Sequence, residues 1–236
     1  MALPMMQTPT YELTIPSTKK KVKFRPFLVK EQKALMIAQH SEEPQVMIDT
    51  LKDIIKSCVS NVDVDKLAIF DLEYIFLQLR AKSIGETAEV VYSCLQCNDP
   101  KGKVTLNIDV TDISVEFHPN HENTIELFDE VGVKMKYPGL DFLGSIDELD
   151  LNNPTDALKI ISNCIEYIYD GDKIYDTKDQ TPEEINHFLE NLTFAQLDKI
   201  KKFFETLPKL KKKIEFDCPV CKYHHNYMIQ GINNFF

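Results

Sequence analysis

The sequence predicts an α+β fold, with a β-hairpin and helices first and then a β region that two cysteine pairs hold together. Three observations predict it. Alternating apolar and polar residues open the chain, apolar residues at helical spacing follow, and strand-like segments return after residue 86 and near the C-terminus. With 236 residues, 43% of them hydrophobic and 27% charged, the chain can bury a core and has an ordinary globular composition.

The first 84 residues are expected to form a hairpin followed by helices. Residues 11–15 and 21–24 alternate in polarity and flank a turn that begins at Pro16, which is a hairpin pattern. Pro26 ends the second strand because proline has no N–H to donate. Helices are predicted over residues 30–39, 44–58 and 65–82. The third is apolar on nearly every side, which is typical of a helix at the centre of a core.

A β region is predicted from Glu86 onward. Strand-like segments cover residues 88–94, 103–110, 115–118 and 131–137, and return over residues 214–217 and 223–229. Because the two sets are far apart in the sequence, the residues between them are expected to be an insertion within one fold.

The predicted insertion is acidic and helical. Asn153 and Pro154 open a helix that is expected to run to about Tyr169, and capping boxes at Thr181 and Thr193 begin two more helices. The predicted parts are therefore residues 1–84 with the hairpin and helices, residues 85–138 with 209–236 as the β region, and residues 139–208 as the insertion. All three are expected in one compact unit.

Charge and motifs exclude several classes of protein. The chain carries 27 basic and 37 acidic residues, a net charge of -10, and an acidic surface repels nucleic acid and anionic membranes. Its apolar runs are too short for a transmembrane helix. It has neither a GxGxxG nor a GxxxxGK[ST] motif for nucleotides, and no Ser/His/Asp order or GxSxG motif for nucleophilic catalysis. We therefore expect no enzymatic activity and no catalytic residues.

Four of the six cysteines form two CxxC pairs, Cys94 with Cys97 and Cys218 with Cys221. Each pair follows a strand-like segment and lies at a predicted turn. A two-residue spacer lets both thiolates face one ion, and two such pairs provide the four sulfurs that a structural zinc site uses. The sequence therefore predicts a structural Zn²⁺ site. Cys58, on an apolar helix face, is expected to be a buried and inert thiol.

Alternatives to this zinc site remain. The pairs could be redox disulfides, although neither precedes the helix that a thioredoxin-like site uses. They could be free thiols, or they could bind iron. A histidine could replace one thiolate, and the candidates are His118, His121, His224 and His225. Four cysteines are the simpler ligand set, and such a site leaves no open position for catalysis.

The segment from Phe24 to Glu31, FRPFLVKE, followed by Ala34 to Ala38, ALMIA, resembles the T4-like bacteriophage baseplate family of hub subunits and hub assembly proteins. The resemblance is strong over the first 40 residues and looser to about residue 85. It implies a structural or assembly protein of a contractile-tail baseplate hub, made in the host cytoplasm and located in the virion tail. Its implied partners are other hub or tail proteins.

Two other roles are weighed against a structural hub role. The first is an assembly chaperone that is absent from the mature virion. The second is a zinc-ribbon nucleic-acid-binding protein, which the acidic balance opposes. Within the family-like segment, Arg25 and Phe27 are predicted to bind a partner, because arginine and aromatic residues dominate interface hot spots. The competing interpretation is that Arg25 stacks or caps carbonyl groups within the fold.

Overall fold

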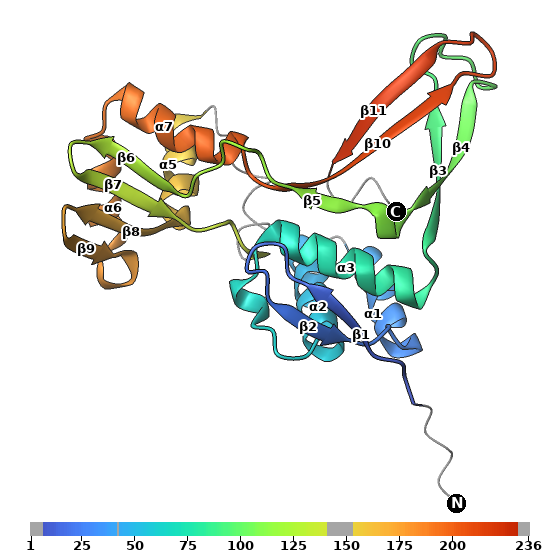
Figure 1. Cartoon of the computed structure of the whole chain (residues 1–236), viewed down its shortest axis with the longest axis horizontal. Coiled ribbons are helices and arrows are strands. Elements are labelled where there is room, and N and C mark those ends of the chain that lie inside the picture. Colours follow the sequence, from blue (N-terminus) through green and yellow to red (C-terminus); the bar gives the residue numbers. More distant parts are fainter. Residues whose placement is uncertain (1–6, 42, 141–152, 231–236) are drawn as a thin grey trace, which may run out of the picture. The chain divides into compact units, whose positions relative to one another are not determined.

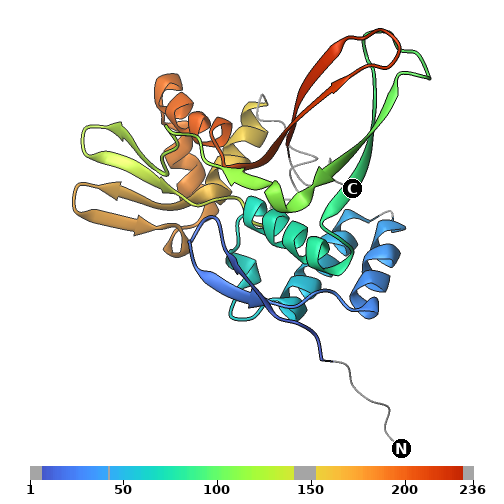
Figure 2. The ribbon, with the colours of Figure 1, turned by 45° about the vertical axis from the view of Figure 1, so that its right-hand side comes forward.

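The computed structural model (Figures 1 and 2) describes residues 7–41, 43–140 and 153–230. The predicted α+β class is confirmed, since the described residues form six α-helices and several small antiparallel sheets. The chain forms two compact units. The first comprises Met1–Glu116 and Lys209–Phe236, and the second comprises Phe117–Pro208. The second unit therefore includes strands that the sequence had assigned to the β region, and the units divide the chain differently from the three predicted parts.

The first unit opens with the predicted hairpin, β1 (Tyr11–Thr14) and β2 (Lys21–Phe24). Three helices follow, α1 (Val29–Gln39), α2 (Pro44–Cys58) and α3 (Ile69–Ser83). The third begins later than predicted, after a short 3-10 turn. Its side chains Ile75, Leu77 and Leu79 are completely buried, which confirms that α3 lies in the core.

Asp71 is a polar exception within α3. This carboxylate is completely buried. It accepts hydrogen bonds from the backbone N–H and the hydroxyl of Ser17, in the turn between β1 and β2. It also accepts from the backbone N–H of Ala68 at the start of α3. Asp71 thus joins the hairpin turn to the first turn of the central helix.

Two long hairpins complete the first unit. One is formed by β3 (Thr87–Ser93) and β4 (Lys103–Asp109), and the other by β10 (Lys209–Asp217) and β11 (His224–Gln230). A short strand, β5 (Ser114–Glu116), pairs with the start of β10. Both views show the two hairpins side by side, with their turns at a common tip. This arrangement brings the two CxxC segments together.

The second unit packs helices against a four-stranded antiparallel sheet in the order β6-β7-β8-β9. Its elements are β6 (Thr124–Phe128), β7 (Val131–Met135), α5 (Pro154–Cys164), β8 (Ile165–Asp170), β9 (Lys173–Asp176), α6 (Pro182–Glu190) and α7 (Phe194–Glu205). Its core includes Val133 from the sheet and Ile161, Ile200 and Phe203 from the helices. The capping boxes at Thr181 and Thr193 are confirmed at the starts of α6 and α7.

One predicted element in this unit is wrong. The helix expected from Asn153 to about Tyr169 ends at Cys164, and Ile165–Asp170 is strand β8. Residues 165–169 alternate Ile, Glu, Tyr, Ile and Tyr, and β-branched and aromatic residues favour strands. Pairing with β7 on one side and β9 on the other then satisfies the backbone of β8. The predicted insertion therefore contains sheet as well as helix, and its residues 141–152 lie outside the described part.

Candidate metal centre and N-terminal segment

The four predicted cysteine ligands meet at the common tip of the two long hairpins. The Sγ atoms of Cys94 and Cys221 are 3.7 Å apart, and those of Cys97 and Cys218 are 3.8 Å apart. All four sulfurs lie within 4.8 Å of one another, and none is in a disulfide. Four sulfurs placed tetrahedrally at about 2.3 Å from a zinc ion would be separated by about 3.8 Å. The spacing of the sulfurs therefore fits one metal ion bound between the two pairs.

The two CxxC turns have the same backbone geometry. The N–H of the residue after each second cysteine donates to the carbonyl of the first cysteine, from Asn98 to Cys94 at 3.2 Å and from Lys222 to Cys218 at 3.0 Å. Asn98 and Lys222 both adopt positive φ angles, 49° and 60°. Each first cysteine also donates its own N–H across its hairpin at 3.0 Å, to Gly102 or to Tyr223. The two turns thus present their sulfurs in matching ways.

Gly102 allows close packing within the Cys94–Cys97 turn. A Cβ atom at this position would lie 3.2 Å from the Cβ of Cys94 and 3.4 Å from the Sγ of Cys218. The first distance is closer than ordinary van der Waals contact, so a larger residue here would push against the cysteine cluster. The glycine therefore leaves the space that the backbone of this turn and the Cys94 side chain need.

Backbone amides face three of the sulfurs and affect their ionisation. The N–H of Cys221, with that of Val220, lowers the pKa of Cys218 to about 7 against the opposing effect of burial. The N–H of Tyr223 favours the thiolate of Cys221, but burial and the neighbouring thiols raise its pKa to about 12. Thiolates this close together repel one another, so a bound cation is needed for all four to ionise.

The histidines near the cysteines have distinct environments. His224 is exposed, and its Nδ1 lies 2.8 Å from the carboxylate of Asp217. His225 is buried, and its Nε2 lies 3.1 Å from the Sγ of Cys94. The sequence placed both residues on the strand that leaves the turn, but did not predict this contact. Alternation along β11 could have indicated that His225 is buried, because residue 225 faces the same side of the strand as buried Ile229.

His118 and His121 belong to the second unit. The Nδ1 of His121 lies 2.9 Å from the hydroxyl of Thr206, and its ring packs against Tyr137 and Phe203. The Nδ1 of His118 accepts a hydrogen bond from the backbone of Asn120. Within the described ranges, the grouping of possible metal ligands contains the four cysteines and no histidine.

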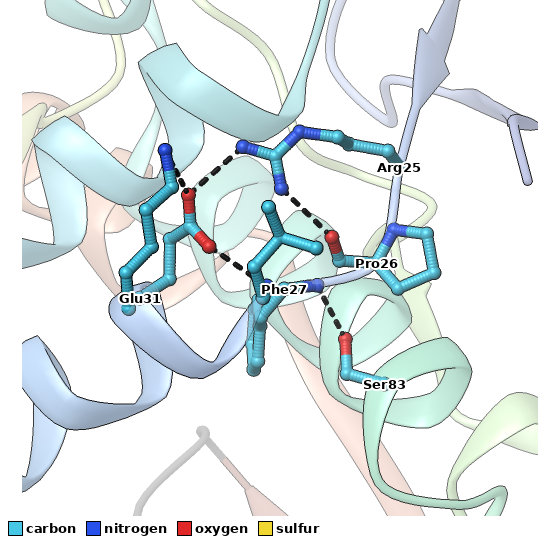
Figure 3. A network of polar contacts seen from close by, with 7 residues as sticks. Arg25, Pro26, Phe27, Glu31 and Ser83 are labelled. Carbon is cyan, nitrogen blue, oxygen red and sulfur yellow. Dashed lines mark hydrogen bonds and ion pairs between the residues drawn. The ribbon is translucent and has the colours of Figure 1, made fainter. Parts of the chain in front are cut away.

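The segment from Arg25 to Glu31 forms a polar network at the start of α1 (Figure 3). The guanidinium of Arg25 donates to the carboxylate of Glu31 at 2.8 Å and to the carbonyl of Pro26 at 2.9 Å. Glu31 also accepts the backbone N–H of Leu28 at 2.7 Å, which caps the helix. Glu31 is only 5% exposed. Arg25 therefore neutralises a buried acid that fixes the start of α1.

Phe27 is likewise held within the fold. Its backbone N–H donates to the hydroxyl of Ser83 at 2.8 Å, and its ring lies 5.6 Å from that of Phe76. These contacts support the structural interpretation of Arg25 and Phe27, and their role in partner binding stays a prediction. Three apolar side chains of α1 are more accessible, namely Val29, Met36 and Ile37, which are 82%, 56% and 61% exposed.

Replacing Arg25 by alanine should raise the pKa of Glu31. Burial alone raises this pKa, and the hydrogen bonds from Arg25 and Leu28 together hold it below its ordinary value. In the wild type, the stabilisation from ionised Glu31 is present above its unfolded pKa and is lost as the pH falls through the lower folded pKa. Arg25→Ala should reverse the lowering of the Glu31 pKa. It should also lower the unfolding free energy by about 1–3 kcal/mol at neutral pH. An NMR titration of Glu31 with urea unfolding checks both effects, and an unchanged Glu31 pKa would contradict the network.

The chain belongs to the T4 bacteriophage base plate protein family, whose model matches residues 8–236, and the resemblance of the N-terminal segment is thereby confirmed. It is 21% identical over 229 residues to the baseplate hub assembly protein gp26 of Enterobacteria phage T4, covering 96% of this chain and 97% of that protein. No solved structure matches the chain. In the part of the chain that the structure describes, no helix has the length and apolar character needed to span a membrane.

Proposed function

We propose that this protein helps to build the baseplate hub of a contractile phage tail by binding other baseplate proteins. The observation that carries the proposal is the match to the base plate family over residues 8–236. The similarity to a hub assembly protein over nearly its whole length supports the hub as the site of action. On this proposal the protein is made in the host cytoplasm, works in the assembling tail, and has no enzymatic role.

We further propose that one structural Zn²⁺ binds Cys94, Cys97, Cys218 and Cys221. The sulfur separations of 3.7 and 3.8 Å and the matching turns support it. Four thiolates fill a tetrahedral site, so the ion would hold the hairpins together and would not bind a substrate. The same four sulfurs also fit iron, and elemental analysis of the purified protein separates the two metals.

The surface proposed to meet a partner is the face of α1 that carries the exposed apolar side chains Val29, Met36 and Ile37 around the exposed Lys33. Isolated apolar residues on a surface are common, but these three lie on one short helix whose start the Arg25–Glu31 ion pair fixes. A preorganised apolar surface loses little entropy on binding. In this view Arg25 and Phe27 support the contact from within the fold.

Met36→Glu should impair hub assembly without unfolding the protein. A phage that lacks this gene would be complemented with the variant, and infectious particles and hub complexes would be counted. We expect affinity for the partner to fall by at least about tenfold, because a charge replaces an apolar contact. Val91→Glu is the matched control, since Val91 is 59% exposed on β3. Normal assembly with a folded Met36→Glu protein would contradict the proposed surface.

An assembly factor that leaves the finished particle is the second candidate, because the T4 relative is named a hub assembly protein. Such a factor would bind the same partners as a hub subunit, but only during morphogenesis. Quantitative mass spectrometry of purified virions distinguishes the two roles. A hub subunit would be present at a fixed ratio to the other baseplate proteins, and an assembly factor would be lost.

A further inference from the structure

We propose that His225 is a positioning residue of the cysteine metal centre, which holds the Cys94 thiolate in place by a hydrogen bond and is itself oriented by Tyr227. The proposal rests on the metal site proposed above. It predicts that His225 and Tyr227, which lie outside the CxxC motifs, directly affect the affinity of the site for its metal ion.

A chain of hydrogen bonds leads from Tyr227 through His225 to Cys94. The Nε2 of His225 lies 3.1 Å from Cys94 Sγ, and its Nδ1 lies 2.8 Å from the hydroxyl of Tyr227. A thiolate can only accept, so Nε2 must carry the proton. The Nδ1 of the neutral ring is then an acceptor, and the Tyr227 hydroxyl donates to it. Alternation along β11 places residues 225 and 227 on the same face of the strand.

Cys94 has a side-chain donor within hydrogen-bond distance of its sulfur, the imidazole of His225. The N–H groups of Val220 and Cys221 face Cys218, that of Tyr223 faces Cys221, and that of Asp99 faces Cys97. Backbone amides of the turns thus contribute to holding the sulfurs. The imidazole N–H of His225 adds a side-chain donor at Cys94. Such donors stabilise negative charge on a sulfur that binds metal, and they orient the ligand.

Aromatic packing fixes the imidazole. The ring of Phe216 lies 4.7 Å from that of His225 with an interplanar angle of 23°, and the ring of Tyr223 packs edge-on at 4.8 Å. The ring of Tyr92 in β3 lies 6.0 Å from that of Phe216. His225 is only 3% exposed. The donor is therefore held at one orientation by side chains from both hairpins.

The distances assign His225 to an outer position and not to the ligand set. If His225 Nε2 and Cys94 Sγ both bound one tetrahedral zinc ion, they would be separated by about 3.5 Å. The observed 3.1 Å is shorter and suits a hydrogen bond to sulfur. The four cysteines already provide a complete tetrahedral set.

The test compares Zn²⁺ affinity among variants of the full chain. His225→Phe keeps the ring packing and removes the donor, Tyr227→Phe removes the hydroxyl that orients the ring, and His225→Gln restores an N–H near Nε2. His224→Phe is the matched control, because His224 is exposed on the same strand and pairs with Asp217. Competition with a chromogenic chelator measures Zn²⁺ affinity and its rate of loss. Bound Co²⁺ reports the thiolate ligands through its sulfur-to-metal charge-transfer band.

We expect His225→Phe to weaken Zn²⁺ binding by about 10- to 100-fold, the usual effect of removing such an outer partner. Tyr227→Phe should have a smaller effect of the same sign, and His225→Gln should recover most of the affinity. The Co²⁺ band should keep its four-thiolate intensity in all variants and shift in His225→Phe. The His224→Phe control should bind Zn²⁺ as the wild type does.

Wild-type Zn²⁺ affinity in folded His225→Phe would overturn the proposal. Equal losses of Zn²⁺ affinity in His225→Phe and His225→Gln would also overturn it, because they would indicate a packing role alone. If Cys94→Ser binds Zn²⁺ fully while His225→Phe does not, His225 is a ligand and the proposal is wrong. If His225→Phe fails to fold by circular dichroism, Tyr227→Phe decides, and unchanged Zn²⁺ loss from it contradicts the proposal. A wild-type chain that binds neither Zn²⁺ nor Co²⁺ would instead overturn the metal site itself.

Discussion

Replacing Cys218 by serine should abolish stoichiometric metal binding and lower the melting temperature of the first unit. Cys218 is completely buried in the cluster, and its loss leaves three thiolates and a weaker ligand. The metal ties together hairpins whose cysteines are 121 positions apart, so its loss removes a long-range link. A ligand present at about 1,000 times its Kd stabilises the native state by about 4 kcal/mol, and we expect a loss of that order.

Calorimetry with and without a strong chelator measures this effect. Cys58→Ala is the matched control, because Cys58 is a buried free thiol outside the cluster. The Cys58→Ala control, in which Cys218 is intact, should keep one metal ion per chain. With metal in excess, it should not show the fall in melting temperature that follows loss of the metal. A chelator that strips the metal without changing the melting temperature would show that the ion does not stabilise the fold.

Replacing Asp71 by alanine should lower the unfolding free energy by about 2–4 kcal/mol. The buried carboxylate accepts two hydrogen bonds from Ser17 and one from the N–H of Ala68. Burial raises the pKa of Asp71 against the opposing effect of Ser17, so the carboxylate depends on these donors. The alanine variant would leave the donors without their acceptor and separate the hairpin turn from α3.

Urea unfolding of Asp71→Ala measures the loss, with Asp65→Ala as the control. Asp65 has a side chain that is 55% exposed and forms long ion pairs with Lys52 and Lys56. Such surface pairs contribute at most about 1 kcal/mol, so the control should change stability little. Equal effects of the two substitutions would contradict the role of Asp71 in joining the hairpin to the central helix.

Local patterns predicted much of the fold. Alternation indicated β1 and β2, helical spacing indicated α1, α2 and α3, and the capping boxes indicated the starts of α6 and α7. Strands β8 and β9 were not predicted, although residues 165–169 favour a strand, because β8 pairs with β7 from an earlier part of the chain and β9 in turn pairs with β8. Asp71 was also missed, since a helix that is apolar on nearly every side gives no sign of a partner 54 positions away.

The cysteine cluster was predicted because CxxC spacing is local, even though the two pairs are remote from each other. The contact of His225 with Cys94 was not, because it joins residues 131 positions apart and depends on the register of two separate hairpins. The sequence also suggested Arg25 as a partner-binding residue. Arg25 is only six positions from its ion-pair partner Glu31 in the sequence. The burial of that pair, however, becomes apparent only when the helices pack.

X-ray absorption spectroscopy at the zinc edge of the protein purified with excess Zn²⁺ tests the central claim most directly, because it reports the atoms that surround the ion. The account predicts one zinc ion per chain with four sulfur neighbours at about 2.3 Å and no nitrogen or oxygen neighbour at about 2.0 Å. A first shell of nitrogen or oxygen atoms, or a protein that retains no metal, would contradict it.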